Sequence, residues 1–363
     1  CACLVGSEMC IRDSEGLDQY RGWFQSSLLT AVGAFGQGAP FKECVTHGWT
    51  VDGEGKAMHK SLGNGVDPAD VFNENGADIL RLWAASADYH ADVRCSKEIF
   101  KQLSQNYLKF RNTCKFMLDN LVDFDPENLV KPEEMPVLDR WLLTKLNELI
   151  EKAEQSYCDY EFHIITHAVN DFCVNTLSSF YLDIVKDRLY CEGAESATRR
   201  SAQTALYLTL HTLSKLFAPI LAFTCDEIWL AMPHTGDDDA RNVVLNEMNK
   251  PFTAYALTAE EMANWEKLAE VRTVVNGVLE AARAEKKIGK SLEADVHLTV
   301  PAEDAFLANV DGKELADLLI VSQVEVTVGD SVKASAEEAA GTKCPRCWKH
   351  STACLLYTSP SPR

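Results

Sequence analysis

Residues 46–64, THGWTVDGEGKAMHKSLGN, combine a short apolar run with a glycine-rich turn and a segment that contains lysine and serine. Gly63 and Asn64 end the segment, and both residue types favour tight backbone turns. A lysine on a glycine-hinged loop suits a ligand with several phosphate oxygens, because its ammonium group is a compact point charge. The segment therefore predicts a phosphate-binding loop, although a lysine and a serine alone more often mark a solvated surface turn.

The composition is that of an ordinary soluble protein with a substantial core, since 46% of the 363 residues are hydrophobic and 25% are charged. This length favours about two domains. The sequence contains no run of about 18 uncharged apolar residues and no signal-peptide pattern, so we expect no membrane association. The formal charge of -19 argues against a general nucleic-acid coat, but a local contact is compatible with it.

Cysteine usage indicates a reducing compartment. Four of the 13 cysteines fall in the terminal segments 1–14 and 354–363. Seven of the remaining nine are scattered singly. Several lie in apolar helical surroundings, where buried free thiols are expected, as for Cys114, Cys173 and Cys225. This distribution predicts a cytoplasmic protein.

Apolar residues recur at helical spacing over much of the chain. The expected helices cover residues 24–32, 77–87, 99–118, 138–153, 162–189 and 197–217. Asp67 and Pro68 mark the start of a further helix, and residues 44–47 a short strand. Long helices joined by short connections, such as the proline-containing loop 123–136, predict a helix bundle.

Beyond a polar, turn-rich boundary at residues 233–239, the pattern changes to a mixture of helix and strand. The expected elements are a helix over 260–287, strands over 297–300 and 321–328, and a helix over 305–319. Residues 330–342 are small and acidic, which predicts a linker. The expected fold class is thus mainly α, with a bundle followed by a small α+β appendage.

Three blocks carry a resemblance to a known family. Within residues 46–64, the stretch MHKSLGN resembles the KMSKS loop of class I aminoacyl-tRNA synthetases. Together with EGLDQYRGWF at residues 15–24 and CPRCW at residues 344–348, it resembles the isoleucyl-tRNA synthetase family in particular. The similarity extends over most of the chain, from residue 15 to near residue 350.

The resemblance implies a division into domains. These are the C-terminal part of a Rossmann-like class I catalytic domain over residues 15–96, a helix-bundle anticodon-binding domain over 97–232, a helix with a small α+β domain over 233–330, and a linker with half of a zinc knuckle over 331–353. The family's HIGH motif and editing domain have no counterpart here, so we expect the C-terminal part of a longer enzyme. Residues 1–14 and 354–363 resemble translated sequencing-adapter readthrough and are expected to be artefacts.

The resemblance also implies a reaction: ATP-dependent activation of isoleucine to isoleucyl-adenylate and transfer to tRNA(Ile) by a monomeric cytoplasmic ligase that uses Mg2+ and Zn2+. The chain alone is expected to be inactive. A valyl- or leucyl-type class I synthetase is an alternative, against which the DQYRGWF and CPRCW stretches argue. A non-catalytic tRNA-binding helical module is another alternative, but such a module has no use for a phosphate-binding lysine.

Lys60 matches the second lysine of the KMSKS pattern and is the expected catalytic residue. Activation is an in-line attack by a carboxylate on the α-phosphate, so the protein must align two anions and neutralise phosphate charge. The resemblance implies as further ATP-binding residues Met58, His47 and Gly48. It implies as residues that bind isoleucyl-adenylate Glu15, Asp18, Gln19 and Trp23. A backbone-bonded His47 and a core Trp23 are the alternative interpretations.

The loop departs from the family pattern at two positions. Ala57 stands in place of the first lysine and His59 in place of the first serine. Lys56, one residue earlier, is a candidate to substitute in part. The departure weakens the case for two lysines that share the phosphate charge, but it leaves Lys60 in place.

Basic positions on the expected helices are candidates for tRNA contact, although each one alone is more often a solvated or paired helix charge. They are Lys109, Arg111, Lys186, Arg188, Arg199, Arg200, Arg283, Lys286, Lys287 and Lys290. We expect a basic face as a whole to contact tRNA.

Cys344 and Cys347 form a C-x-x-C pair, which supplies two of the four ligands of a tetrahedral structural zinc. The family has a second such pair further on. Here the nearby candidates are His350 and Cys354, and both are poorly placed. We therefore expect half of a zinc site.

Overall fold

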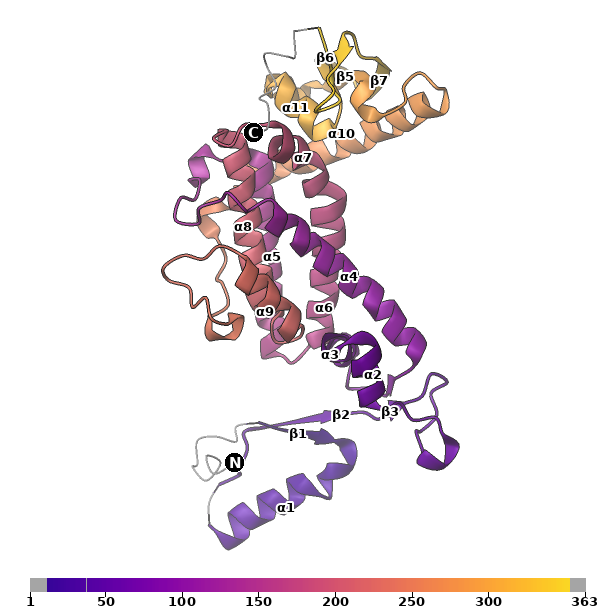
Figure 1. Ribbon diagram of the computed structural model, residues 1–363, viewed down its shortest axis with the longest axis vertical. Coiled ribbons are helices and arrows are strands. Elements are labelled where there is room, and N and C mark those ends of the chain that lie inside the picture. The colour runs from indigo at the N-terminus through magenta and orange to yellow at the C-terminus, as the bar shows by residue number, and fades with distance from the viewer. Residues whose placement is uncertain (1–11, 37, 353–363) are drawn as a thin grey trace. The chain divides into compact units, whose positions relative to one another are not determined.

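The computed structural model describes residues 12–36 and 38–352 (Figure 1). They form two compact units. The N-terminal unit contains the described residues up to 108 with 153–168 and 219–223, and the C-terminal unit contains 109–152, 169–218 and 224–352. The secondary structure is mainly helical, as the periodicity predicts. None of the helices in these ranges has the length and apolarity needed to cross a membrane.

The terminal segments expected to be artefacts lie outside the described residues, apart from residues 12–14, which belong to the first strand. Cys354 lies outside them as well.

Two short parallel strands begin the N-terminal unit. β1 (Arg12–Gly16) and β2 (Glu43–His47) pair so that Glu15 lies opposite Thr46. Between them come a 3-10 turn (Leu17–Tyr20) and α1 (Trp23–Leu29), which continues as a π-helical turn (Thr30–Ala34). The helix predicted over 24–32 and the strand predicted over 44–47 are therefore confirmed.

A small apolar core supports the rest of this unit. α2 (Pro68–Asn75) begins as predicted, because Asp67 accepts a hydrogen bond from Ala69 N at 2.9 Å. α3 (Ala77–Ser86) follows, and β3 (Thr50–Val51) pairs in parallel with β4 (Val93–Arg94). The core cluster consists of Val71, Ile79, Cys95 and Phe100. Residues 52–67, which we call the lysine loop, connect β3 to α2, and α2 contributes Val71 to this core.

The helices predicted over 99–118, 138–153, 162–189 and 197–217 are confirmed, and a further short helix, α9, follows them. They are α4 (Lys97–Asp119), α5 (Val137–Cys158), α6 (Phe162–Asp171), a π-helical segment (Phe172–Tyr181), α7 (Leu182–Cys191), α8 (Ala197–Phe217) and α9 (Ala222–Ala231). α6, the π-helical segment and α7 are continuous, as the single helix predicted over 162–189 requires. Cys114, Cys173 and Cys225 are buried, as predicted, and none of them forms a disulfide within the described residues.

A buried carboxylate links several helices of the C-terminal unit. Asp139 of α5 accepts hydrogen bonds from Tyr181 Oη at 2.8 Å and from Ser201 Oγ at 2.5 Å. Arg188 Nη1 of α7 lies 3.5 Å from both carboxylate oxygens. Burial raises the pKa of Asp139, and these three partners act in the opposite direction. Because Arg188 is only 5% exposed, this candidate for tRNA contact is an internal partner of Asp139.

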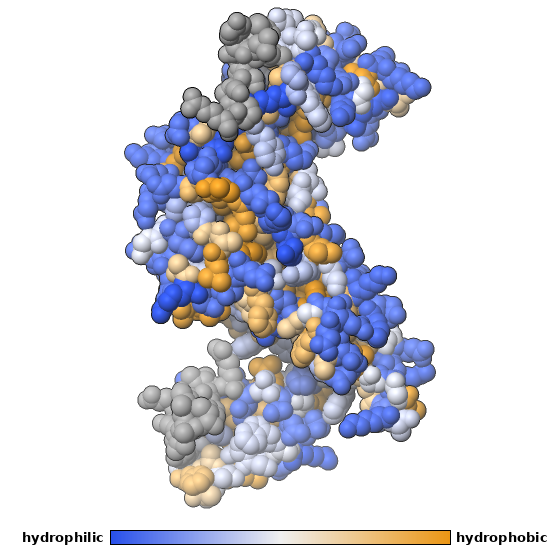
Figure 2. Space-filling model, viewed as in Figure 1, coloured by the Kyte–Doolittle hydropathy of each residue, from blue (hydrophilic) through white to orange (hydrophobic). Residues whose placement is uncertain are grey.

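Residues 259–338 of the C-terminal unit, which we call the appendage, combine helices with a three-stranded sheet. β5 (Ala294–Pro301) is central, with β6 (Gln323–Gly329) parallel on one side and β7 (Lys333–Glu338) antiparallel on the other. α10 (Ala259–Ala284) packs against β7, and α11 (Gly312–Leu319) packs against β6. Figure 1 shows the two helices next to each other beside the sheet, and Figure 2 shows a mainly hydrophilic surface over the appendage.

Two predictions for the appendage are wrong. Residues 330–342 are not a linker, because β7 occupies 333–338 and pairs with β5 over its whole length. The helix predicted over 305–319 is two elements, a 3-10 segment (Ala302–Asn309) and α11. Asp311 separates them, since its side chain caps α11 by accepting from Lys313 N and Glu314 N.

Candidate functional site

The candidate nucleotide site lies in the N-terminal unit, where β1 and β2 end side by side. Their register places Glu15 opposite Thr46 and Gly16 opposite His47, at the carboxyl edge where parallel strands commonly bind ligands. Glu15 and His47 are both exposed there. The strand pairing thus brings together a residue expected to bind the adenylate and one expected to bind ATP.

Gly48 is required by a close backbone contact. Its N–H donates to Tyr89 O at 2.8 Å, and a Cβ atom at this position would lie 2.4 Å from Ala91 O. The His47 ring contacts the Gly48 carbonyl, with Nδ1 2.9 Å from the oxygen. The backbone-bonded alternative for His47 is therefore present, and Nε2 is the ring atom that remains for a ligand.

Two side chains close the lysine loop. Asp52 Oδ1 accepts from Lys56 N at 2.8 Å and Oδ2 accepts from Asn64 Nδ2 at 2.8 Å. Asn64 Oδ1 in turn accepts from His59 N at 2.9 Å. The hydrogen bond from Asn64, with those from the backbone, lowers the pKa of Asp52. This Asp52–Asn64 clasp ties the start of the loop to its end.

The two lysines of the loop differ in their surroundings. Lys60 is exposed in a 3-10 turn (Lys60–Leu62) that ends at Gly63 with φ of 63°. Within the part of the chain that the structure describes, Lys60 forms no ion pair. Lys56 pairs with Glu54, with Nζ and Oε2 2.7 Å apart. Met58 packs against the apolar core cluster, so its side chain anchors the loop.

Three residues expected to bind the adenylate form one surface cluster after β1. Gln19 Nε2 donates to Asp18 Oδ2 at 3.1 Å, and Gln19 Oε1 accepts from Trp23 N at 3.0 Å. Trp23 is 53% exposed, and its Nε1 donates to Asp13 Oδ2 at 3.2 Å. The core interpretation of Trp23 is therefore wrong for this structure.

A pocket of about 430 Å³ lies against the same strand ends. Its lining is mainly aromatic and aliphatic, and His47 is the predicted site residue that contributes to it. Arg81 forms part of the wall and is held by the carbonyl oxygens of Pro219 at 2.7 Å and Ile220 at 3.0 Å. The full lining is Ser14, Val45, His47, Arg81, Ala84, Ala85, Tyr89, Tyr157, Phe162, Pro219 and Ile220.

The predicted zinc ligands lie in a hairpin of the C-terminal unit, β8 (Thr342–Lys343) and β9 (His350–Ser351). Burial acts to raise the pKa of the Cys344 thiol, but the amides of Cys347 and Arg346 and the Cys347 side chain bring that pKa below its usual value. The two thiols are therefore in contact. Residues 12–36 and 38–352 contain no group of three or more His, Cys, Asp or Glu side chains arranged for a metal ion.

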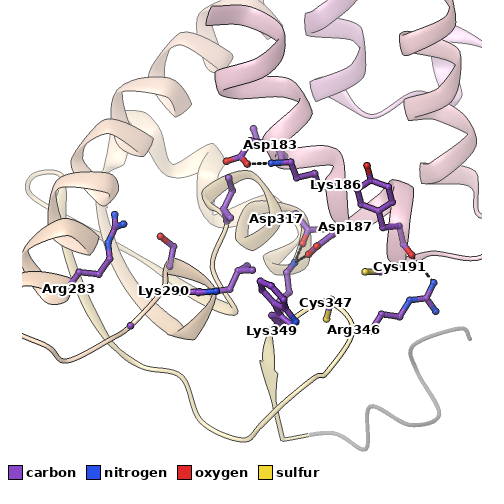
Figure 3. A pocket seen from close by; sticks show the side chains of 17 residues that line it. Asp183, Lys186, Asp187, Cys191, Arg283, Lys290, Asp317, Arg346, Cys347 and Lys349 are labelled. Atoms are coloured by element: carbon purple, nitrogen blue, oxygen red, sulfur yellow. Dashed lines mark hydrogen bonds and ion pairs between the residues drawn. The ribbon is translucent and has the colours of Figure 1, made fainter. Parts of the chain in front are cut away.

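A pocket of about 600 Å³ lies beside this hairpin, between α7, α11 and residues 283–292 (Figure 3). Five basic and three acidic side chains line it, which makes it a local excess of positive charge in an acidic chain. Lys290 Nζ lies 4.4 Å above the ring of Trp348, which is half exposed. We call this site the basic pocket. Exposed cations beside an aromatic ring are typical of a nucleic-acid contact.

The other basic candidates fall into two groups. Arg199 and Arg200 both pair with Asp123, at 2.7 and 3.7 Å. Within the described ranges, the candidates that are exposed and form no ion pair are Lys109, Arg111, Arg283, Lys286 and Lys290. Of the basic positions proposed from the sequence, these five are the ones whose charge is available for contact with tRNA.

Sequence reasoning missed the residues that hold these sites in shape. Asp52 and Asn64 are separated by 12 positions, and each is an ordinary turn residue by itself. Lys349, which lies between Asp187 and Asp317 in the basic pocket, belongs to no motif. Only the tertiary contacts identify these residues.

Comparison with known proteins defines the class. Residues 9–96 match the family model for tRNA synthetases class I (I, L, M and V), and residues 139–298 match the anticodon-binding domain of tRNA ligase.

Two solved structures share the fold. A LeuRS–tRNA–LeuAMS complex from Agrobacterium radiobacter K84 matches with a TM-score of 0.52 and 16% identity, over 80% of this chain and 30% of that chain. Methionyl-tRNA synthetase from Mycobacterium tuberculosis, in complex with methionyl-adenylate, matches with a TM-score of 0.51 and 19% identity, over 61% of this chain and 44% of that chain. The chain belongs to the class I aminoacyl-tRNA synthetases.

Within this class its curated relatives include isoleucine–tRNA ligases, as the sequence resemblance predicts. The protein from Moorella thermoacetica is 47% identical over 350 residues, which are 92% of this chain and 37% of that protein. The protein from Caldanaerobacter subterraneus is 46% identical over 351 residues, 93% of this chain and 37% of that protein. The protein from Syntrophotalea carbinolica is 46% identical over 350 residues, with the same two shares. The chain therefore spans little more than a third of the length of these relatives.

Proposed function

We propose that this chain is the part of an isoleucine–tRNA ligase that carries the ATP-phosphate loop and the tRNA-binding helices. The complete protein activates isoleucine with ATP to isoleucyl-adenylate and transfers the isoleucyl group to tRNA(Ile). The observation that carries the proposal is Lys60, which is exposed and forms no ion pair with any described residue, on a loop closed by Asp52 and Asn64, in a chain that is 47% identical to an isoleucine–tRNA ligase.

Lys60 acts on the triphosphate of ATP. The attacking carboxylate of isoleucine is already ionised, so the reaction requires alignment and charge neutralisation and needs no general base. The exposed ammonium group of Lys60, on a loop whose two ends are joined by Asp52 and Asn64, supports this role. Lys56 contributes less, because Glu54 already neutralises it. Mg2+ bound with ATP would neutralise a further part of the triphosphate charge.

The strand ends bind the remainder of the adenylate. Glu15 can accept a hydrogen bond from the substrate ammonium group or a ribose hydroxyl. His47 Nε2 and the close backbone turn at Gly48 offer an edge for the adenine. Asp18, Gln19 and Trp23 form the adjacent surface. Met58 takes part through its backbone, because its side chain is packed in the core.

The domain organisation follows the family. Residues 15–96 are the end of a Rossmann-like catalytic domain, residues 97–232 the anticodon-binding bundle, and residues 233–330 a helix with a small α+β domain. The parallel pairing of β1 and β2 and the sheet of the appendage support this division. The protein acts in the cytoplasm as a monomer.

Cys344 and Cys347 are two ligands of a structural zinc. The contact between the two thiols supports this assignment, because a C-x-x-C pair held close together can supply two ligands to one zinc ion. Zinc would tie the hairpin into one rigid knuckle. In the resembled family a second cysteine pair further along the chain supplies the other two ligands.

The proposal is tested by amino-acid-dependent ATP–pyrophosphate exchange in the full natural protein that carries this sequence. Isoleucine should support faster exchange than valine or leucine at equal concentration, and the same protein should charge tRNA(Ile). Preference for valine or leucine would assign the chain to another member of the class. Absence of exchange with all three amino acids would overturn the catalytic proposal.

A further inference from the structure

Two of the contacts that attach the hairpin over residues 342–351 to the appendage lie at the starts of sheet strands. Lys343 Nζ pairs with Glu293 Oε1 at 2.8 Å, and His350 N donates to Ser322 Oγ at 2.7 Å. Glu293 comes just before β5 and Ser322 just before β6. These bonds hold the hairpin to the sheet, and neither of them reaches the helix bundle.

Toward the bundle, two side chains of the hairpin reach α7. Arg346 Nη2 donates to Tyr190 O at 2.8 Å. Lys349 Nζ lies 3.4 Å from Asp187 Oδ2 of α7, and it also pairs closely with Asp317 of α11. Figure 3 shows Lys349 between the two carboxylates. One ammonium group therefore joins the hairpin, the bundle and the appendage.

We propose that Lys349 is a positioning residue that seats the appendage on α7 and so sets the spacing of the cations around the basic pocket. Lys290 belongs to the appendage and Lys186 to α7, so the distance between them depends on that seating. An RNA backbone is a chain of regularly spaced phosphates, and its binding requires cations at matched positions. The inference rests on the proposed tRNA-binding function.

The surroundings of Lys349 argue for positioning over direct contact with RNA. Its side chain is 19% exposed, and two carboxylates already surround its ammonium group. Burial raises the pKa of Asp187, and the negative charge of Asp317 raises it further. The positive charge of Lys349 acts in the opposite direction. Removal of the ammonium charge would leave two neighbouring carboxylates unpaired, which disfavours the contact between α7 and α11.

The first test measures the affinity of the full 363-residue chain for a tRNA(Ile) transcript. Lys349→Met keeps most of the side-chain stem and removes the charge. It should raise Kd roughly tenfold, because several phosphate contacts lose their alignment, and Lys349→Arg should restore most of the affinity. Lys343→Met is the matched control, since Lys343 of the hairpin pairs with Glu293 and not with α7, and it should leave Kd within about twofold of the unmodified chain.

The second test separates positioning from direct contact by the sign of one effect. Asp317→Asn removes a negative charge from the basic pocket. It should weaken tRNA binding as Lys349→Met does, and the double variant should bind no more weakly than the weaker single variant, because both changes break one contact. If Lys349 bound a phosphate directly, Asp317→Asn would strengthen binding. Stronger binding by Asp317→Asn therefore overturns the proposal.

The third test needs no tRNA. The hairpin amides of Cys344 and Trp348, which donate to Lys349 O and Cys344 O, should exchange hydrogen several-fold faster in Lys349→Met than in the unmodified chain. Equal exchange in Lys349→Met and the unmodified chain overturns the positioning role whether or not tRNA binds. An unmodified chain that binds no tRNA overturns the proposed tRNA contact and leaves the exchange result to decide the role of Lys349.

Discussion

Lys56 and Lys60 lie in one loop, yet their electrostatic surroundings differ. Lys56 pairs with Glu54 at 2.7 Å, whereas Lys60 is exposed without an ion pair in the described ranges. The sequence showed that Lys60 matches a lysine of the phosphate-binding pattern and that Lys56 lies one residue before the position of the other lysine. It could not show which of them carries uncompensated charge, because that depends on how the Asp52–Asn64 clasp folds the loop.

In the full natural protein, Lys60→Ala should lower the rate of ATP–pyrophosphate exchange by roughly two orders of magnitude, the effect expected when one preorganised charge at the transition state is lost. Lys56→Ala is the matched control and should lower the rate much less, since Glu54 already neutralises that charge. Isoleucine affinity should change little in either variant. Equal losses in the two variants would remove Lys60 from its special role.

At the scale of elements, long helices were predictable and short pairings were not. The helices from residue 97 to 217 repeat apolar residues over several turns, so the signal accumulates. β7 has no such signal: its residues 333–338, KASAEE, are small or charged, and they form a strand because β5 offers a partner edge. The break before α11 could have been found from Asp311 and Gly312, a typical capping pair.

The start of α10 provides a prediction for stability against pH. Glu261 forms a capping box with Thr258 and a double contact with Arg140, at 2.7 and 3.0 Å. The hydrogen bond from Arg140, followed by those from Thr258, lowers the pKa of Glu261 from 4.5 to about 2. A carboxyl whose pKa is lower in the folded state stabilises the protein above its unfolded pKa, and this stability is lost as the pH falls from 4.5 toward 2.

Glu261→Gln should therefore reduce the free energy of unfolding at neutral pH by about 1 kcal/mol, a modest value because the pair is partly exposed. Its unfolding temperature should fall less steeply than that of the unmodified chain between pH 4.5 and pH 2. Glu260→Gln, the neighbouring first-turn residue, controls for the general effect of charge at a helix start. If the unfolding temperatures of the Glu261→Gln variant and the unmodified chain fell equally steeply between pH 4.5 and pH 2, Glu261 would not be the source of this pH dependence.

At the scale of the whole molecule, net charge and local charge have opposite signs. The chain carries -19, so its average field repels a polyanion. The basic pocket has more cations than anions, and two of its lining cations, Arg283 and Lys290, are exposed. Binding of tRNA by such a molecule depends on a few contacts at one place, so it should be weak at high salt.

With about four phosphate contacts, a fourfold rise in salt should weaken tRNA binding by the 363-residue chain roughly a hundredfold. Arg283→Ala or Lys290→Ala should each reduce the slope of log Kd against log salt by about 1, the change expected for the loss of one phosphate contact. Lys115→Ala, an exposed lysine that pairs with Asp119 on α4, should leave the slope unchanged. Affinity that does not depend on salt would exclude a phosphate-based contact, and the bundle would then need another partner.

The Asp52–Asn64 clasp also has a consequence for entropy. Fixing the backbone of one residue costs about 1–2 kcal/mol in lost conformations, and an open loop of this length would lose that freedom when it orders around a ligand. Because Asp52 and Asn64 join its ends, the loop is a small ring whose conformations are already restricted before ATP arrives. The affinity of this loop for a triphosphate is then set as much by the rigidity of the ring as by the charge of the lysine that it presents.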